Sequence, residues 1–318
     1  MKITNKHNID LPMAMFLVND DYDLIKENNY ISVTGLLKPI KAIILNSRIE
    51  ASAPDVLDFV ASRVGTSIHN YFEAAWLNGK HIINMKKLGY PDNIINKIKI
   101  NPNNPDKNDF PVYLEQRVIK TIHGYKIGGK YDLILENTIH DVKSVKAFSV
   151  MKNDTTDYKL QMSIYKWLNQ DKVTENFGKI LFLVTDFKQF EADAKPNYPQ
   201  LPILTKKIPL MSIEETEAWI NNKLHAIESL IDADQSLLPD CTDKELWQDP
   251  TKYAYFKNPT GKRATKVFDT ADLANIKLMS DGSVGKIEVR PGKPKRCNYC
   301  SVKESCHQAQ AFSAQGLL

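Results

Sequence analysis

The sequence predicts an α/β fold: a mixed central β-sheet flanked by helices, followed by a cysteine-rich C-terminal extension. Two observations predict the sheet. Two β-type runs are separated by a short polar turn at Asn137-Thr138, and residues 179–185 form an apolar run rich in β-branched residues, as buried strands do. A third observation predicts the helices, because apolar residues recur at helical spacing around these strands. The order helix, three strands, helix, strand, helix is typical of a mixed sheet covered by helices.

Each predicted helix rests on its apolar spacing or on a start signal. The second of the N-terminal helices would begin with Thr66 or Ser67 as its cap. In the central helix, Leu160, Ile164 and Trp167 share one face. The predicted helices are 55–60, 66–77, 157–169 and 213–231.

The strands and loops follow from β-type runs and from clusters of turn-forming residues. Residues 112–120 are predicted as one strand, and 125–136 and 139–145 as two strands joined by the polar turn. Residues 101–109 consist largely of turn-forming residues, and residues 192–202 contain three prolines and show no helical or strand period, so both are predicted as surface loops.

Composition and charge exclude several classes of protein. The chain has 318 residues, of which 42% are hydrophobic and 25% charged, so a packed globular protein is expected rather than a disordered one. Apolar runs fall short of the roughly 18 residues that a membrane span needs, and the first residues lack a secretory signal. We therefore expect a cytoplasmic protein with no membrane partner. The net charge of +4 permits nucleic-acid binding.

The central signal is a pair of acidic motifs on neighbouring predicted strands. Asp132 follows Gly129 in a G-x-x-D pattern, and Asp141 and Lys143 form D-x-K nine residues later. Asp141 and Lys143 are two residues apart and therefore project from the same face of a strand. Two carboxylates on adjacent strands can share one hard cation such as Mg²⁺ or Mn²⁺. Taken alone, the motif favours solvated strand aspartates near a turn, one of them paired with Lys143.

Two further groups complete an ordered set. His69 lies in G-T-x-x-H on an earlier helix, and Gln161 and Tyr165 share a face of the following helix at i and i+4. Together the motifs resemble the RecB-like nucleases of the PD-(D/E)xK superfamily, whose motifs come in the same order. The resemblance spans roughly residues 63–166 and implies a restriction-endonuclease-like core in a hydrolase that cleaves DNA.

The resemblance also implies roles for individual residues. Asp132, Asp141 and the backbone carbonyl of Val142 would bind magnesium or manganese, with His69 as a ligand or a neighbour of the metal. Lys143 would be the catalytic lysine, and Gln161 and Tyr165 would position the lysine, the water or the DNA backbone. Glu115 would be an extra carboxylate for a second metal, or it would pair with Arg117 at the surface.

Four cysteines lie near the end of the chain, three of them as C-x2-C-x5-C. They are Cys297, Cys300 and Cys306, with Cys241 upstream. Such a layout favours a [4Fe–4S] iron–sulfur cluster, with zinc or no metal as alternatives. The triplet resembles that of AddB and the CRISPR-associated adaptation nucleases. In those relatives the remote cysteine precedes the nuclease core, whereas Cys241 follows it here, so this cluster would fasten the C-terminal segment to itself.

A basic segment at residues 252–266 is a candidate DNA-binding surface. It carries five basic residues, no acidic residue and interleaved aromatic side chains. The alternative is a solvated loop whose aromatic residues belong to the core. The candidate contacts are Lys252, Tyr253, Lys257, Lys262, Arg263 and Lys266.

The combined reading is a magnesium-dependent deoxyribonuclease, an exonuclease of recombination or DNA-end processing. A catalytically inactive DNA-binding or scaffold protein and a nicking or site-specific endonuclease are the alternatives. A single-strand annealing protein or a helicase would be a partner. Residues 34–39 are similar to the entry segment of phage-encoded members, which indicates a phage origin and hence the host cytoplasm. The expected domains are an entry segment (1–50), the nuclease core (51–236) and a basic C-terminal region with the cysteine site (237–318).

Overall fold

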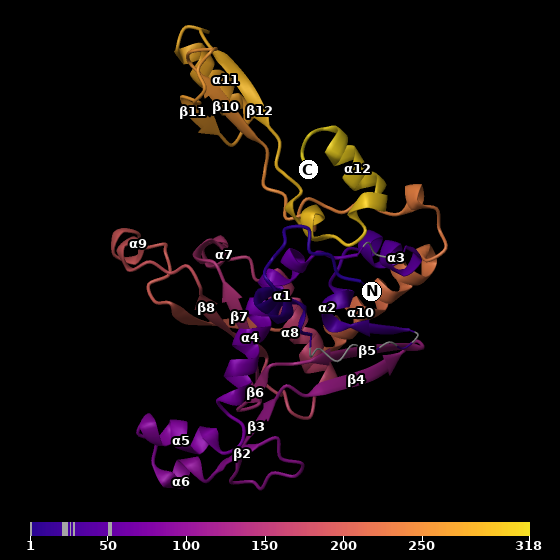
Figure 1. Cartoon of the computed structure of the whole chain (residues 1–318), viewed down its shortest axis with the longest axis vertical. Coiled ribbons are helices and arrows are strands. Elements are labelled where there is room, and N and C mark those ends of the chain that lie inside the picture. Colours follow the sequence, from indigo (N-terminus) through magenta and orange to yellow (C-terminus); the bar gives the residue numbers. More distant parts are fainter. Residues whose placement is uncertain (1, 21–24, 26, 28, 50–52) are drawn as a thin grey trace. The chain divides into compact units, whose positions relative to one another are not determined.

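The structure is a computed structural model that describes residues 2–318 apart from 21–24, 26, 28 and 50–52 (Figure 1). The chain divides into two compact units, residues 1–37 with 53–222, and residues 38–52 with 223–318. The division at 222/223 falls within helix α10 (Ile213–Leu230). The expected domain boundary at 50/51 lies outside the described residues, and the one at 236/237 stays a prediction.

A six-stranded mixed sheet forms the centre of the first unit. Its strand order is β2-β3-β6-β7-β8-β9, with β2 parallel to β3, β7 parallel to β8, and antiparallel pairs elsewhere. The strands are β2 (Ile98–Ile100), β3 (Phe110–Leu114), β6 (Leu133–Leu135), β7 (Thr138–Val145), β8 (Phe177–Val184) and β9 (Ile203–Pro209). The mixed α/β fold expected from the sequence is therefore confirmed, as is the hairpin between β6 and β7.

A second, three-stranded sheet was not expected. It has the order β1-β5-β4 and consists of β1 (Tyr30–Ser32), β4 (Arg117–Ile122) and β5 (Tyr125–Lys130). The prediction of single strands over 112–120 and 125–136 is therefore wrong. The first run breaks at Glu115, whose φ of +50° no strand residue adopts, and the second breaks at Tyr131-Asp132, where the chain passes from one sheet to the other.

Helices cover both faces of the six-stranded sheet (Figure 1). Gly65 of α4 (Val60–Ala74) lies nearest Ser144 of β7, whereas Met162 of α8 (Thr156–Leu168) borders Gly178 of β8 together with Ile139 of β7. Because Ile139 and Ser144 are an odd number of residues apart, they point to opposite faces. Thus α4 and α8 lie on opposite faces of the sheet.

The start of α4 differs from the prediction. A 3-10 turn, η1 (Val56–Phe59), leads directly into Val60, and Asp55 and Asp58 form a capping box at its beginning. Ser67 lies inside the helix, where its hydroxyl donates to the carbonyl of Arg63, so neither Thr66 nor Ser67 is a cap. The central helix α8 agrees with its predicted bounds to within one residue at each end. The first unit also contains α1 (Leu11–Val18), α2 (Val33–Leu36), α5 (Lys80–Lys87), α6 (Asp92–Ile95), α7 (Ala147–Lys152) and α9 (Gln189–Ala194).

The second unit combines a short N-terminal segment with the C-terminal third of the chain. Helix α3 (Ile40–Arg48) contributes Ile44 and Leu45 to a core that otherwise comes from the C-terminal part. Strands β10 (Lys252–Phe256), β11 (Lys266–Phe268) and β12 (Lys286–Arg290) form an antiparallel sheet against which α11 (Ala271–Ser280) packs. The remaining elements are η2 (Gln235–Leu237), η3 (Lys295–Tyr299), η4 (Lys303–Ser305) and α12 (His307–Ala314).

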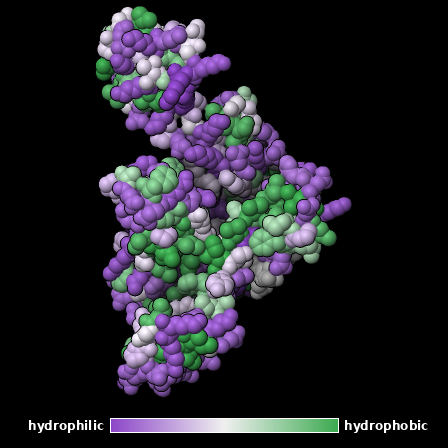
Figure 2. Space-filling view, turned by 60° about the vertical axis from the view of Figure 1, so that its left-hand side comes forward, coloured by the Kyte–Doolittle hydropathy of each residue, from purple (hydrophilic) through white to green (hydrophobic). Residues whose placement is uncertain are grey.

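Apolar side chains remain exposed on the first unit, and Figure 2 shows such side chains gathered on one face of the molecule. They include Leu11 and Met15 on α1, Phe148 on α7 and Phe190 on α9. None of the helices in the described residues combines the length and the hydropathy that crossing a bilayer requires.

The glycine of the G-x-x-D motif has a packing role. A Cβ atom at Gly129 would lie 2.5 Å from Cε1 of Tyr165 and 2.7 Å from Cγ2 of Val33, so only glycine lets α8 and α2 approach β5 this closely. Tyr165 is buried, and its hydroxyl donates to the carbonyl of Lys130, which follows this glycine in β5. The motif glycine thus sets the distance between the second sheet and the helix that carries Gln161 and Tyr165.

We expect Gly129→Ala to lower the free energy of unfolding by about 1–3 kcal/mol, because the ring of Tyr165 must move. Gly65→Ala is the matched control, since it lies inside α4 with its nearest neighbour 3.9 Å from the added Cβ. This control should raise stability by about 0.5–1 kcal/mol. Urea unfolding of both variants measures the difference. Equal effects would contradict the packing role.

Candidate metal centre and the cysteine site

Asp132 lies where the two sheets of the first unit separate. The β6–β7 ladder ends at the pair Leu133–His140, so the next residues in register are Asp132 and Asp141. In place of a ladder bond, Oδ2 of Asp132 accepts a 2.7 Å hydrogen bond from the backbone N–H of Val142. Asp132 therefore lies just before β6 and not within a strand as expected, and its side chain ties the separated backbone to β7.

Three potential ligands meet at this point. One ligand atom from each of His69, Glu115 and Asp132 lies within 4.8 Å of the other two. His69 comes from α4, and its Nδ1 is 3.3 Å from Oδ1 of Asp132. Glu115 comes from the left-handed break between β3 and β4. A histidine nitrogen with two carboxylates is a donor set that suits a divalent cation.

Asp141 and Lys143 form an ion pair on β7, as their spacing predicts. Nζ of Lys143 lies 2.8 Å from both carboxylate oxygens of Asp141 and donates its hydrogen bond to Oδ1. Oδ2 is buried, and in the described part of the chain it accepts no hydrogen bond. The ammonium group of Lys143 is the cation that lies beside this oxygen, and Asp141 is not part of the group of three possible ligands. Metal ligation by Asp141 therefore stays a prediction.

The electrostatics couple these side chains. Burial raises the pKa of Asp141, and Lys143 opposes this effect. Burial lowers the pKa of Lys143, but the carboxylates of Asp141 and Asp132 outweigh it, so that the pKa lies above its ordinary value. The hydrogen bond with Asp132 raises the pKa of His69 despite burial. The carboxylates of Asp132 and Asp141 thus stabilise positive charge in the cluster, as on His69 and Lys143.

Glu115 pairs with Lys130 rather than with Arg117, the surface partner considered from the sequence. Nζ of Lys130 lies 2.6 Å from Oε2 of Glu115. Burial raises the pKa of Glu115, which Lys130 opposes. Lys130 lies within the G-x-x-D motif, yet its type and spacing gave no reason to single it out.

The face of α8 that carries Gln161 and Tyr165 also carries Tyr158. The ring of Tyr158 lies 6.0 Å from Nζ of Lys143, and the amide of Gln161 is 3.5 Å from the hydroxyl of Tyr165. Sequence reasoning missed Tyr158, although the spacing i, i+3, i+7 from Tyr158 to Tyr165 could have revealed it. The catalytic roles of Gln161 and Tyr165 stay predictions, as does metal ligation by the carbonyl of Val142.

We expect Glu115→Gln to weaken Mn²⁺ binding by about 10-fold or more, because an amide is a poorer ligand than a carboxylate for a hard cation. Glu136→Gln is the matched control, because Glu136 is an exposed glutamate whose backbone φ of +51° is close to the +50° of Glu115. Isothermal titration with Mn²⁺ measures both variants. Equal affinities for the two variants and the wild type would remove Glu115 from the centre.

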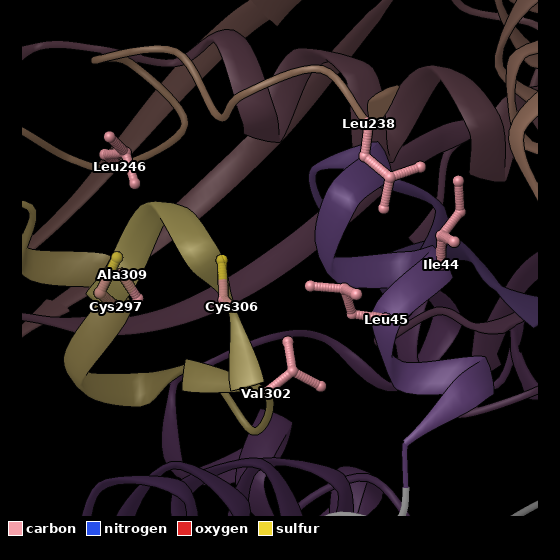
Figure 3. Close-up of a cluster of buried hydrophobic side chains, with 8 residues drawn as sticks. All are labelled: Ile44, Leu45, Leu238, Leu246, Cys297, Val302, Cys306 and Ala309. Atoms are coloured by element: carbon pink, nitrogen blue, oxygen red, sulfur yellow. The ribbon is translucent and has the colours of Figure 1, made fainter. Parts of the chain in front are cut away.

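The four cysteines all belong to the second unit and are free thiols. Cys297 and Cys306 are buried in the core that α3 shares with the C-terminal segment, where Val302 points toward Leu45 (Figure 3). Cys241 and Cys300 pack against the same core. Burial raises the pKa of Cys241 to about 12 and also raises the pKa of Cys297. The thiols that the sequence singled out therefore share one core.

The distances between the cysteine sulfur atoms are too long for zinc binding without side-chain rotation. Within the described residues, no three cysteine sulfurs lie within 4.8 Å of one another. Tetrahedral zinc, with Zn–S bonds of about 2.3 Å, needs sulfur atoms roughly 3.8 Å apart. The side chains would have to rotate to bind zinc, and both the iron–sulfur cluster and zinc stay predictions.

Two glutamines join the segment around Cys241 to the segment around Cys306. The amide of Gln308 donates to the carbonyl of Cys241 and accepts from its N–H, both at 2.9 Å. The amide of Gln235 donates to the carbonyl of Ser305 and accepts from the N–H of His307. The side chains of Gln308 and Gln235 thus hold the segment around the remote cysteine to the segment around the triplet. Whether a metal cluster also fastens the two segments stays a prediction.

We expect Gln308→Leu to destabilise the protein by about 1–3 kcal/mol, because it leaves both polar groups of the Cys241 backbone without their partner. Cys241 should then react faster with a thiol reagent. Gln310→Leu is the control, since exposed Gln310 makes a single bond, to the carbonyl of Glu304. Urea unfolding and thiol-reaction rates compare the two variants. Equal stability and equal reaction rates would contradict the role of Gln308 in holding the Cys241 backbone.

The basic segment at residues 252–266 forms β10, a loop and the start of β11. Lys257, Lys262, Arg263 and Lys266 are exposed, Tyr253 is half-buried, and Lys252 pairs with Asp269. The other aromatics serve the core, because Tyr255 and Phe256 are buried. The hydroxyl of Tyr255 also contacts Asp281 and the carbonyl of Val284. DNA binding by the exposed cations stays a prediction.

Comparison with known proteins finds similarity among solved structures alone. No protein-family model matches the chain, and no curated protein matches it. SSO0001 is 16% identical with a TM-score of 0.41 over 71% of this chain and 90% of that one. The alkaline exonuclease LHK-Exo from Laribacter hongkongensis is 14% identical with a TM-score of 0.28, over 39% of this chain and 60% of that one.

A phage-related exonuclease from Haemophilus somnus 129PT is 19% identical with a TM-score of 0.25, over 39% of this chain and 61% of that one. The chain thus spans about three fifths of the length of each of these two exonucleases. At these identities and TM-scores, the likeness says nothing of this chain's activity.

Proposed function

We propose that this chain is a divalent-metal-dependent DNA nuclease with a PD-(D/E)xK-type site of the RecB-like kind. The observation that carries the proposal is the gathering of His69, Glu115 and Asp132 beside the buried Asp141–Lys143 pair. Carboxylates and an imidazole can hold a divalent metal that promotes phosphodiester hydrolysis, and an ammonium group beside them can stabilise charge on the phosphate. A protein that only bound DNA would need no buried carboxylate in its site.

The donor set fits Mg²⁺ or Mn²⁺ through Asp132, Asp141, His69 and Glu115, with the carbonyl of Val142 as a further ligand. When bound, such a metal supplies Lewis acidity toward a phosphate oxygen and lowers the pKa of a coordinated water. Lys143 holds its positive charge beside these carboxylates and can donate hydrogen bonds to the water or to the phosphate. Asp132 keeps its backbone bond to Val142, which fixes the carboxylate.

The helix α8 supports this arrangement from the other side. Tyr158 covers the ammonium group of Lys143, and Tyr165 anchors α8 to the backbone of Lys130. Gln161 lies between these two tyrosines on the same helix face and can orient a phosphate oxygen or a water. The motif resemblance adds the finer parts of the proposal. They are an exonuclease mode, a role in recombination or DNA-end processing, a phage origin, and a partner that anneals or unwinds strands.

We expect Lys143→Ala to digest end-labelled linear duplex DNA about 10²- to 10⁴-fold more slowly than the wild type in Mg²⁺ or Mn²⁺. Loss of the ammonium group removes a proton donor and a charge that stabilises the phosphate. Lys86→Ala is the control, because Lys86 pairs with Asp92 on the surface of α5 and α6. A wild-type rate for Lys143→Ala would refute the proposed mechanism.

The same assay distinguishes the alternatives. Closed circular DNA should stay intact if the protein is an exonuclease, and nicks in it would indicate an endonuclease instead. A wild-type protein that binds linear DNA but leaves it undigested with either metal would be the inactive scaffold.

A further inference from the structure

The second unit contains a cavity outside the proposed nuclease site. It has a volume of about 230 Å³ and lies between the beginning of α3 and two C-terminal loops. Its lining includes Lys38, Asn46, Trp247, Arg296 and Tyr299, and it borders on Cys241, Cys297 and Cys300. The cavity therefore combines aromatic rings, cations and the cysteine core in one place.

Two large aromatic side chains at this cavity are left in solvent. Tyr299 is 80% exposed and Trp247 is 47% exposed. Their ring centroids are 6.2 Å apart and the planes are inclined by 52°, so that the rings form two adjoining walls. The guanidinium carbon of Arg296 lies 5.1 Å from the centroid of Trp247. Exposed aromatics backed by an arginine form a surface on which a flat ring can stack.

The backbone holds Trp247 in an unfavourable conformation. Its φ of +51° is uncommon for a bulky residue, and such strain persists only where the surroundings fix it. Backbone hydrogen bonds hold the residues before and after Trp247. The N–H of Gln248 donates to the carbonyl of Asp243, and the N–H of Arg296 donates to the carbonyl of Leu246. Core packing does not explain the strain, because nearly half of the Trp247 side chain remains in water.

The charges at the cavity favour an anion. Lys38 and Arg296 contribute positive charge, and Glu245 is the acidic residue in the described lining. The carboxylate of Glu245 already accepts hydrogen bonds from the N–H and the hydroxyl of Thr242, at 2.9 and 3.0 Å. A ligand with a flat ring and an attached negative charge matches both the rings and the cations.

We propose that this cavity binds one unpaired nucleotide of a DNA single strand, with the base stacked on Trp247 or Tyr299 and a phosphate near Arg296 and Lys38. The inference rests on the proposed function, because it names a strand-binding subsite for the same substrate. Every residue named in the subsite belongs to the second unit, whereas the metal centre belongs to the first, so the two sites are distinct. The described lining of the cavity also contains none of the exposed cations of the 252–266 segment.

The test compares a labelled dT12 oligonucleotide with an abasic oligonucleotide of equal length, by fluorescence anisotropy without added divalent metal. The full-length wild type should bind dT12 about 5- to 100-fold more tightly, because only dT12 can stack. Trp247→Asn and Tyr299→Ala should lose this preference. Asparagine tolerates the left-handed backbone, so the first variant should fold. Tyr90→Ala, which removes an exposed tyrosine of the first unit, should keep the preference.

Three results would overturn the proposal: equal binding of both oligonucleotides by the wild type, an unchanged preference in both cavity variants, or a loss of preference that tracks a loss of iron or zinc. The last result would assign the cavity to a metal held by the cysteines. Because no cleavage is measured, an inactive protein that prefers dT12 would uphold the subsite and refute the nuclease. An active nuclease without the preference would do the reverse.

Discussion

One hydrogen bond, from the N–H of Val142 to Oδ2 of Asp132, marks the constraint on which the proposed site depends. The chain leaves the small sheet after β5 and joins the large sheet at β6, so the ladder between neighbouring backbones stops one residue short of Asp141. The carboxylate of Asp132 replaces the missing strand partner. A regular hairpin would continue the ladder through Asp132 and Asp141, and the carboxylate of Asp132 would then have no unpaired strand N–H to bind.

The sequence predicts those parts that local patterns determine. The hairpin between β6 and β7, the helix α8 and the buried strand β8 have turn residues or apolar periodicities that act within a dozen residues, and all three occur close to their expected positions. The pairing of Asp141 with Lys143 follows from the two-residue period of a strand. These features need no knowledge of the rest of the chain.

The remaining features depend on contacts between distant segments. The break at Glu115 and the passage at Tyr131-Asp132 separate two sheets, yet both runs look like single strands because β-type residues continue through them. The ion pair of Glu115 with Lys130 depends on that separation, whereas the neighbouring residues in the sequence offered Arg117 as the possible partner. In the same way, no local pattern shows that Gln308 bonds to the backbone of Cys241.

The discontinuous second unit has a consequence for biosynthesis. Ile44 and Leu45 of α3 are buried against Leu238, Leu246 and Val302, the first of which follows Leu45 by roughly 190 residues. A ribosome that adds about 5–20 residues per second takes about 10–40 s to reach Leu238. During that interval the apolar face of α3 has none of its final neighbours from the C-terminal segment. The nascent chain thus exposes an apolar surface, on which a chaperone such as a holdase can act until the C-terminal segment has been made.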